Sequence, residues 1–167
     1  MEILNTNRLI LRTMKEKDFD ILFDKIFSNK NVVANTFGSS GFTKKETEEF
    51  LRTHGNFDSS IGLSVLLEKQ TKTIIGLAGI LSCTYLDEED YEIGFILEET
   101  SWGKGYAKEI GLAQIQQIKN LGKNRALAAA SKTNVASSKS LFSLGFRLVK
   151  ESRDKIRGER LIYSLQL

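Results

Sequence analysis

The sequence of 167 residues contains no proline, a single cysteine and a single histidine. With only Cys83, no intramolecular disulfide can form, which fits a reducing compartment. With only His54, a His-rich zinc site is implausible and a Ser-His triad has one possible histidine. We therefore expect no metal site. Without proline, glycine and clusters of Asn, Asp and Ser must form the turns.

Long apolar runs are also absent, since no stretch approaches the ~18 residues that a membrane-spanning helix needs. The opening MEILNTNRL lacks the basic start and apolar stretch of a signal peptide. The net charge of +3 is mild, whereas nucleic-acid-binding domains carry a concentrated basic face. We expect a cytoplasmic protein with neither membrane nor nucleic acid as a partner. No pattern predicts an oligomeric state.

The length predicts a single domain over residues 1–167, because typical domains hold about 100–150 residues. Alternation with a period of two, as in RLILRT, predicts strands, and a helical period predicts helices. The predicted strands cover residues 8–13, 63–68, 73–81, 91–97, 125–129, 146–150 and 161–165. The predicted helices cover residues 17–27, 42–53, 105–121 and 135–144. This order predicts an α/β (α+β) fold with a mixed, mostly antiparallel sheet of six to seven strands and about four helices.

One segment carries a chemical signal. The strand at 91–97 is followed by a short turn, and Gly103-Lys104-Gly105 then opens a helix. The first N–H groups of a helix have no intrahelical acceptor, so such a turn can bind phosphate. A tight turn that simply needs glycine is the alternative. Dinucleotide binding fits poorly, because Lys108 stands where the GxGxxG pattern needs its third glycine.

Three blocks of the sequence resemble the GNAT superfamily of N-acetyltransferases, in the correct order. WGKGYAKE after YEIGFIL looks like the acetyl-CoA motif Q/R-x-x-G-x-G/A. Asn134-Val-Ala-Ser137 with Leu144-Gly145-Phe146 is similar to the N-x-x-S and G-F block. The opening TNRLILR resembles the ribosomal-protein-alanine acetyltransferase (RimJ/RimL-like) branch. The resemblance covers essentially the whole chain and implies a GNAT-like sheet whose strands splay apart at the cofactor site.

The resemblance also implies an acetyl-CoA site. The pantetheine arm would pair with the main chain of Phe95, Ile96 and Leu97, at the end of the YEIGFIL strand. Main-chain amides of the next block would cradle the pyrophosphate, namely those of Trp102, Gly103, Lys104, Gly105, Tyr106 and Ala107. Asn134 would cap its helix and touch the pantetheine. The motif's Gln/Arg position carries Thr100, a departure that we expect to weaken nothing essential.

Acetyl transfer to an amine requires loss of the ammonium proton and reprotonation of the thiolate. By resemblance, Glu92 is the base, acting through water; the alternative is an exposed strand residue paired with a lysine. The tyrosine that many relatives use as the acid is replaced by Leu141. The branch resemblance therefore points to Ser137, whose alternative role is that of a first-turn residue bonded to backbone.

The predicted function is acetyl transfer from acetyl-CoA to a primary amine by direct attack in a ternary complex. The acceptor is a protein N-terminus or a small amine such as a polyamine, amino acid or aminoglycoside. A non-catalytic acyl-CoA-binding sensor and a nucleotide-binding regulatory module are the alternatives. Two further segments receive simpler interpretations. We expect Cys83 to be a buried, unreactive side chain and Glu88-Glu89-Asp90 to be a solvated loop, which attracts a cationic substrate if it borders the acceptor pocket.

Overall fold

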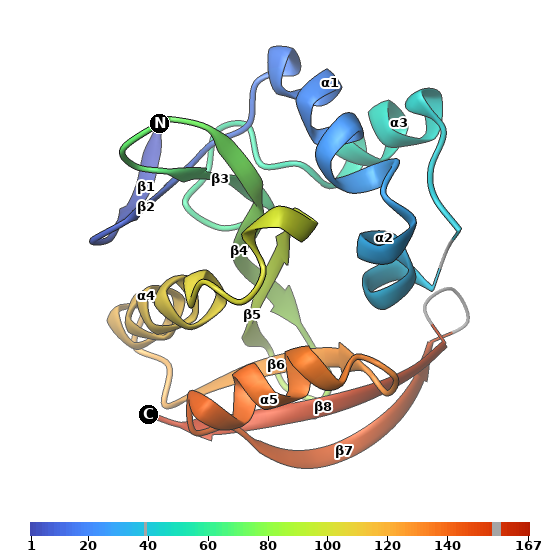
Figure 1. Cartoon of the computed structure of the whole chain (residues 1–167). Helices are drawn as coiled ribbons and strands as arrows, with labels where there is room; N and C mark the ends of the chain where they lie inside the picture. Colours follow the sequence, from blue (N-terminus) through green and yellow to red (C-terminus); the bar gives the residue numbers. More distant parts are fainter. Residues whose placement is uncertain (39, 155–157) are drawn as a thin grey trace.

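A computed structural model of the chain describes residues 1–38, 40–154 and 158–167 (Figure 1). Its strands are β1 (Glu2–Asn5), β2 (Leu9–Arg12), β3 (Ser64–Glu68), β4 (Ile74–Cys83), β5 (Asp90–Leu97), β6 (Arg125–Ser131), β7 (Arg147–Asp154) and β8 (Gly158–Gln166). Its α-helices are α1 (Phe19–Leu22), α2 (Lys30–Phe37), α3 (Lys44–His54), α4 (Tyr106–Asn120) and α5 (Val135–Ser143). Short helical turns are η1 (Glu16–Asp18), η2 (Phe23–Phe27) and η3 (Glu99–Ser101). No helix among these residues is long and apolar enough to cross a membrane.

The strands form one sheet in the order β1-β2-β3-β4-β5-β6-β8-β7. Every neighbouring pair is antiparallel except β5 and β6, which are parallel. The mixed, mostly antiparallel α/β fold is thus confirmed. The sheet has eight strands where six to seven were predicted, and α2 is a helix that the sequence patterns did not indicate.

The two missed elements are short and depend on distant contacts. Strand β1 has four residues and an irregular register against β2, while the chain's amino group donates to Thr13 Oγ1 at 2.7 Å. Helix α2 contains valine, asparagine and threonine, which are weak helix formers. Its cap is Asn29, whose side chain accepts from the main-chain N–H of Asn31 and Val32. Burial of Val32 and Val33 supplies the rest of its stability.

Several predicted boundaries also changed. The helix predicted over 17–27 is divided into η1, α1 and the π-helical turn η2. The last two strands are longer than predicted, extending over Arg147–Asp154 and Gly158–Gln166. The sequence also predicts a turn at Arg157-Gly158-Glu159 between these strands, and it falls partly outside the described residues, because position 157 is not among them. The sequence also predicts a capping box of Thr43 and Glu46 at the start of α3, and the structure has it.

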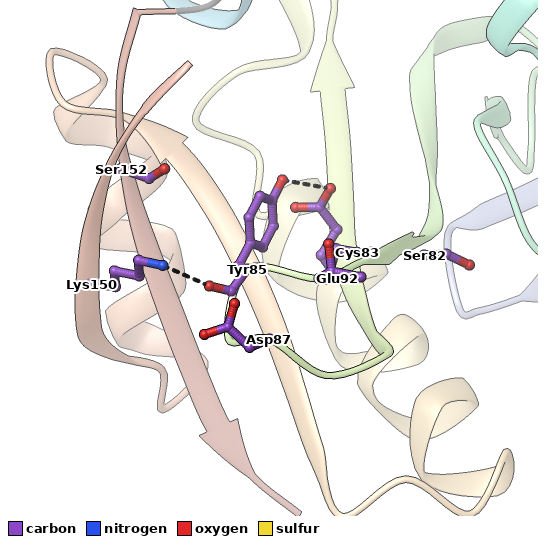
Figure 2. A pocket seen from close by; sticks show the side chains of 8 residues that line it. Ser82, Cys83, Tyr85, Asp87, Glu92, Lys150 and Ser152 are labelled. Atoms are coloured by element: carbon purple, nitrogen blue, oxygen red, sulfur yellow. Dashed lines mark hydrogen bonds between the residues drawn. The ribbon is translucent and has the colours of Figure 1, made fainter.

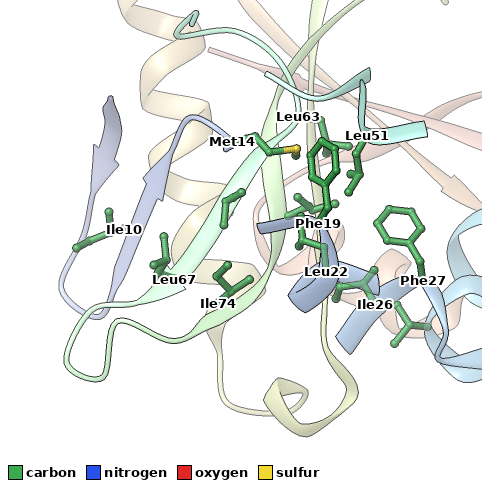
Figure 3. Close-up of a cluster of buried hydrophobic side chains, with 13 residues drawn as sticks. Ile10, Met14, Phe19, Leu22, Ile26, Phe27, Leu51, Leu63, Leu67 and Ile74 are labelled. Atoms are coloured by element: carbon green, nitrogen blue, oxygen red, sulfur yellow. The ribbon is translucent and has the colours of Figure 1, made fainter. Parts of the chain in front are cut away.

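Alternate residues of the central strands pack on opposite faces of the sheet. Ile10 belongs to a cluster with α1, α2 and α3, whereas Leu9 and Leu11 belong to a cluster with α4. Figure 3 shows the first cluster, in which Phe27 is fully buried. A third cluster joins α4 and α5 to β5, β6 and β8. The sheet therefore separates α1–α3 from α4 and α5 (Figure 1).

The parallel pair β5–β6 is paired over only two residues of each strand, Glu92 with Leu127 and Ile93 with Ala128. Strand β5 continues to Leu97 and β6 continues to Ser131 without further pairing between them. The strands splay apart there, as the resemblance implied. Gln114 of α4 is fully buried and donates from Nε2 to the carbonyl of Gly94 at 2.7 Å, at the start of the opening.

An ion pair near the N-terminus fixes the first helical turns to β2. Arg12 forms two hydrogen bonds of 2.8 Å with Asp18, which is 2% exposed and also accepts from the Lys15 N–H at 2.8 Å. Burial alone would raise the pKa of Asp18, but the bonds from Arg12 and Lys15, together with the Arg12 charge, outweigh it and lower that pKa. The pair therefore stabilises the folded state while Asp18 is ionised.

We expect Asp18→Asn to lower the free energy of unfolding at neutral pH by about 2–4 kcal/mol, because it leaves the Arg12 charge uncompensated. Since the folded pKa lies below the unfolded value of about 3.9, this stabilisation is lost as pH falls through the folded pKa. In urea unfolding at a series of acidic pH values, the free energy of unfolding should fall more steeply with decreasing pH for the wild type than for Asp18→Asn. Asp20→Asn, which breaks the exposed pair with Lys44, is the control. Parallel pH profiles for wild type and Asp18→Asn would contradict the assignment.

Candidate active site

The glycine turn that precedes α4 has the backbone conformation that only glycine adopts easily. Gly103 and Gly105 have φ angles of 73° and 81°. Gly105 is the N-cap residue of α4 and supplies no side chain to satisfy the first N–H groups of the helix. The turn therefore needs glycine for its shape, and it also leaves helix N–H groups available to an anion. The two interpretations of the motif are compatible.

A partly exposed set of hydrogen bonds and an ion pair holds this turn from the other end of the chain. Arg8 donates from Nη1 to the carbonyl of Lys104 at 2.9 Å and from Nε to Glu109 Oε2 at 2.7 Å. Its guanidinium lies 4.6 Å from the centre of the Tyr106 ring. Glu109 Oε1 accepts from the Thr6 hydroxyl at 2.6 Å and the Arg8 N–H at 2.7 Å.

The sequence patterns did not assign a role to Arg8 or Glu109, although each lies within a quoted motif, TNRLILR and WGKGYAKE. Partial burial would raise the pKa of Glu109, but the hydrogen bonds from Thr6 and Arg8 and the Arg8 charge outweigh it and lower that pKa. Glu109 is thus held as a carboxylate. It fixes the first turn of α4 against the loop that enters β2.

The end of β5 carries Phe95, Ile96 and Leu97, all within the stretch that has no β6 partner. Trp102 donates from Nε1 to the carbonyl of Leu97 at 3.0 Å, while 43% of the Trp102 residue remains exposed. The indole therefore ties the glycine turn to the end of β5.

The start of α5 lies at the end of β6, on the other strand of the opening. Asn134 is the N-cap residue, and its Oδ1 accepts from the main-chain N–H of Ser137 at 3.1 Å. Its Nδ2 donates to the carbonyl of Asn35 in α2 at 3.4 Å. Ser137 is half-buried in the first turn, and Leu141, four residues later, is 2% exposed in the core. Among the described residues, no group hydrogen-bonds to the Ser137 hydroxyl.

Glu92 lies on β5 immediately before the opening and is 8% exposed. Its cross-strand neighbour Leu81 packs against the cluster of α1–α3, so the Glu92 side chain points to that face. The Tyr85 hydroxyl donates to Glu92 Oε1 at 3.1 Å (Figure 2). Glu92 is therefore buried and bonded to a tyrosine, so it is not the exposed strand residue considered as the alternative.

A pocket of about 410 Å³ opens beside Glu92, and we call it the Glu92 pocket (Figure 2). It is lined from β4, β5, β7 and the loop after β4, with side chains that include Cys83, Tyr85, Asp87, Glu92, Lys150 and Ser152. Lys150 of β7 donates from Nζ to the carbonyl of Tyr85 at 3.0 Å. The pocket brings together segments that the sequence patterns did not connect, and Tyr85, Asp87 and Lys150 were not predicted as site residues.

Cys83 is a half-buried thiol in this pocket. Burial, followed by the charges of Glu92 and Asp90, raises the pKa of Cys83 to about 12. The thiol therefore stays protonated at neutral pH and is unsuited to act as a nucleophile, because the thiolate is the reactive form.

The acidic run 88–90 is anchored, and the prediction of a solvated loop was wrong for Asp90, whereas Glu88 and Glu89 are exposed. Glu88 and Asp90 both pair with Arg125 of β6, at 2.9 and 2.7 Å, and Asp90 is 5% exposed. Lys123 donates to the main-chain carbonyl of Glu89 at 2.6 Å. The loop after β4 is thereby fixed beside the Glu92 pocket. Within the described residues, no group of three or more His, Cys, Asp or Glu side chains is arranged to hold a metal ion.

Comparison with curated proteins gives relatives that match most of the chain. The uncharacterized protein YkkB of Bacillus subtilis is 30% identical over 112 residues, which cover 66% of this chain. The aligned region spans 64% of YkkB, slightly less than two thirds of its length. The uncharacterized N-acetyltransferase YnaD of Bacillus subtilis is 24% identical over 145 residues, covering 86% of this chain and 82% of YnaD.

Solved structures share the fold at lower identity. A GNAT-family acetyltransferase from Bacillus anthracis superposes with a TM-score of 0.80 at 20% identity, over 99% of this chain and 98% of the other. RimL, a ribosomal L7/L12 alpha-N-protein acetyltransferase in complex with coenzyme A, superposes with a TM-score of 0.75 at 15% identity. The match covers 100% of this chain and 98% of RimL. Spermidine N-acetyltransferase from Vibrio cholerae, in complex with CoA and spermine, superposes with a TM-score of 0.73 at 17% identity, over 95% of each chain.

The family model of the acetyltransferase (GNAT) domain matches residues 8–147, a range that contains the glycine turn, the opening between β5 and β6, and Glu92. On the strength of that match, the chain belongs to the GNAT acetyltransferase family and carries the domain of an acetyl-CoA-dependent N-acetyltransferase.

Proposed function

We propose that residues 1–167 act as one domain that transfers the acetyl group of acetyl-CoA to a primary amine, by direct attack in a ternary complex. The observation that carries this proposal is the placement of Glu92. Its buried carboxylate lies one residue before the last β5–β6 pair and lines a pocket on the α1–α3 face of the sheet. The starts of α4 and α5 follow the two strands that diverge there.

Acetyl-CoA binds in this proposal along the opening. The pyrophosphate lies against the main-chain amides at the start of α4, those of Trp102, Gly103, Lys104, Gly105, Tyr106 and Ala107. The uncapped first turn of α4 and the dipole of this 15-residue helix both favour a negative charge there. The pantetheine arm extends along the main chain of Phe95, Ile96 and Leu97, with Asn134 on the opposite side of the opening.

Thr100, at the motif's Gln/Arg position, is exposed in η3. Main-chain amides supply most of the phosphate contacts in this arrangement. Replacement of the motif's Gln or Arg by Thr100 therefore removes no contact on which phosphate binding depends.

Glu92 accepts a proton from the acceptor ammonium, directly or through a water molecule. The free amine then attacks the thioester carbonyl carbon, the C–S bond breaks, and the CoA thiolate takes up a proton. The hydrogen bond from Tyr85 fixes one carboxylate oxygen of Glu92, which orients the base toward the pocket. No covalent enzyme intermediate is involved, which agrees with a Cys83 thiol held in its protonated form.

Ser137 is placed to assist the departing thiolate. It lies in the first turn of α5, one helical turn before Leu141, which packs into the core beneath the helix. Residues four apart share a helix face, so Ser137 is directed to the same side of α5 as the buried Leu141. A serine hydroxyl is a weak acid, and its role is to hydrogen-bond the sulfur or to relay a proton from water.

The acceptor is a protein N-terminus or a small amine. The likeness of TNRLILR to the RimJ/RimL branch, and of the fold to RimL, supports a protein N-terminus. The likeness of the fold to spermidine N-acetyltransferase supports a small amine. A non-catalytic acyl-CoA sensor is the second candidate, and it is favoured by the loss of the usual tyrosine at Leu141. Amine-dependent release of CoA separates the two functions.

Gly105→Glu should place a carboxylate in the proposed phosphate site and abolish measurable binding of acetyl-CoA, through charge repulsion and loss of the left-handed turn. Gly122→Glu is a matched control, because Gly122 has a similar φ of 78° at the far end of α4. Calorimetry with both folded variants provides the measurement. If a folded Gly105→Glu protein bound acetyl-CoA as tightly as the control, the phosphate site would lie elsewhere.

Glu92→Gln should lower kcat by about 100-fold or more, the lower end of the range for a general base. Its affinity for acetyl-CoA should change little, because Glu92 faces the acceptor side of the sheet. Release of CoA with a panel of amines, together with calorimetry, separates the two effects. Tyr85→Phe, which retains the carboxylate and removes its hydrogen bond, should cause a smaller decrease. A loss of acetyl-CoA binding without a selective loss of rate would make Glu92 a structural residue.

Ser137→Ala should slow the chemical step while acetyl-CoA binding remains nearly intact. The decrease should be modest, about tenfold, because a CoA thiol has a pKa near the ordinary ~8.5 and its thiolate leaves without much acid assistance. Single-turnover rates at saturating amine measure this step. Ser138→Ala, which removes the acceptor of the Tyr163 hydrogen bond on the same helix, is a control for disturbance of α5. Unchanged single-turnover rates would leave water as the proton source.

A further inference from the structure

The Glu92 pocket has an uneven charge. Among the described residues that line it, the charged side chains are two carboxylates, Glu92 and Asp87, and one ammonium, Lys150. The other described side chains of the lining are uncharged hydroxyl, phenol and thiol groups. The Lys150 ammonium is already bound to the main-chain carbonyl of Tyr85 at 3.0 Å. The described part of the lining therefore carries more negative than positive charge.

Asp87 differs from the acids that follow it in the loop. Glu88 and Asp90 are both paired with Arg125, whose single positive charge they share. Asp87 is exposed at the pocket and, within the described residues, forms no ion pair. Its φ of 63° lies in the left-handed region, and its N–H donates to the carbonyl of Thr84 at 3.1 Å. This turn, fixed by Arg125 and Lys123, places a carboxylate in the pocket wall at a small cost in backbone strain.

We infer that the pocket selects an acceptor with two cationic groups, a small aliphatic diamine or polyamine, in which Asp87 binds one ammonium while the other meets Glu92. The inference rests on the proposed function, since it takes the Glu92 pocket as the acceptor site. Asp87 is a specificity-determining residue in this arrangement, and Glu92 alone removes the proton.

The size and chemistry of the pocket fit such a ligand. Its volume of about 410 Å³ lies within the range of about 300–1,000 Å³ that small-molecule sites occupy. The hydroxyl groups of Tyr85 and Ser152 supply further acceptors for ammonium N–H groups. A monoamine would leave the Asp87 carboxylate with no cation, and an acceptor that carries a carboxylate would be repelled by it.

The response of Cys83 to this environment points in the same direction. Its thiol lines the pocket, and after burial the charges of Glu92 and Asp90 are the causes that raise its pKa to about 12. Burial disfavours any charged group, but the part of the shift that Glu92 and Asp90 cause reflects a negative potential, which favours a bound cation.

The test compares acceptors of one length: putrescine, n-butylamine and γ-aminobutyrate, each with acetyl-CoA and the full-length protein. Corrected for its two equivalent amines, putrescine should have a kcat/KM about fivefold above that of n-butylamine, the size expected for one partly exposed ion pair. γ-Aminobutyrate should be the poorest acceptor. Raising the ionic strength should reduce the preference for putrescine, because the ion pair is screened.

Asp87→Asn should bring the ratio of kcat/KM for putrescine to kcat/KM for n-butylamine close to one. Asparagine tolerates the left-handed conformation at this position, so the turn is retained. Glu89→Gln is the matched control, since Glu89 is an exposed acid of the same loop that does not line the pocket. This variant should keep the wild-type ratio.

Equal kcat/KM for putrescine and n-butylamine, or a ratio that Asp87→Asn does not change, would overturn the inference and leave the proposed acetyl transfer standing. A preference for γ-aminobutyrate, or for a peptide N-terminus without a second cation, would also overturn it. If no amine released CoA, the proposed function would fail and this inference with it.

Discussion

The short parallel pairing of β5 with β6 is the constraint on which the remaining structure depends. Parallel neighbours in a sheet need a crossover connection, and α4 is that connection. Pairing stops after Ile93 and Ala128, so the two strands diverge toward their C-terminal ends. The turn into α4 follows one strand and the cap of α5 follows the other. Two helix N-termini and unpaired main chain thus meet at one opening, as ligand sites do at the carboxyl ends of parallel strands in α/β sheets.

Contacts from the N-terminal half of the chain hold that opening in place. Lys25 pairs with Glu98 at 3.0 Å, directly after β5. The side chains of Asn29 and Asn31 both donate to Glu99 at 2.9 Å, and these bonds lower the pKa of that carboxyl. Helix α2 therefore has a structural role despite its weak helix formers. The segment that resembles the cofactor motif keeps its shape through residues that no local motif contains.

The sequence predicted the parts of this molecule that have a local signal. Alternation in RLILRT indicated β2, and the glycine turn indicated the start of α4. Residues 30–37 have no such signal, because tertiary burial of two valines and an asparagine cap decide that helix. The ion pair of Arg8 with Glu109 joins positions 101 residues apart, and the approach of Lys150 to Tyr85 spans 65. Contacts of that range follow from strand order, which local periodicity does not determine.

In the proposed function, the alternation of side chains along β5 brings the two substrates to the reaction centre from opposite sides of the sheet. Ile93 packs in the cluster with α4 and α5, so its neighbour Glu92 must face the side of α1–α3. In the proposed function, acetyl-CoA held at the starts of α4 and α5 presents its thioester through the opening, while the amine arrives from the Glu92 pocket. The proposed base and the leaving sulfur would then lie on different sides of the sheet. Because Leu141 is buried in the core, the sulfur would receive its proton from the first turn of α5 or from water that enters the opening.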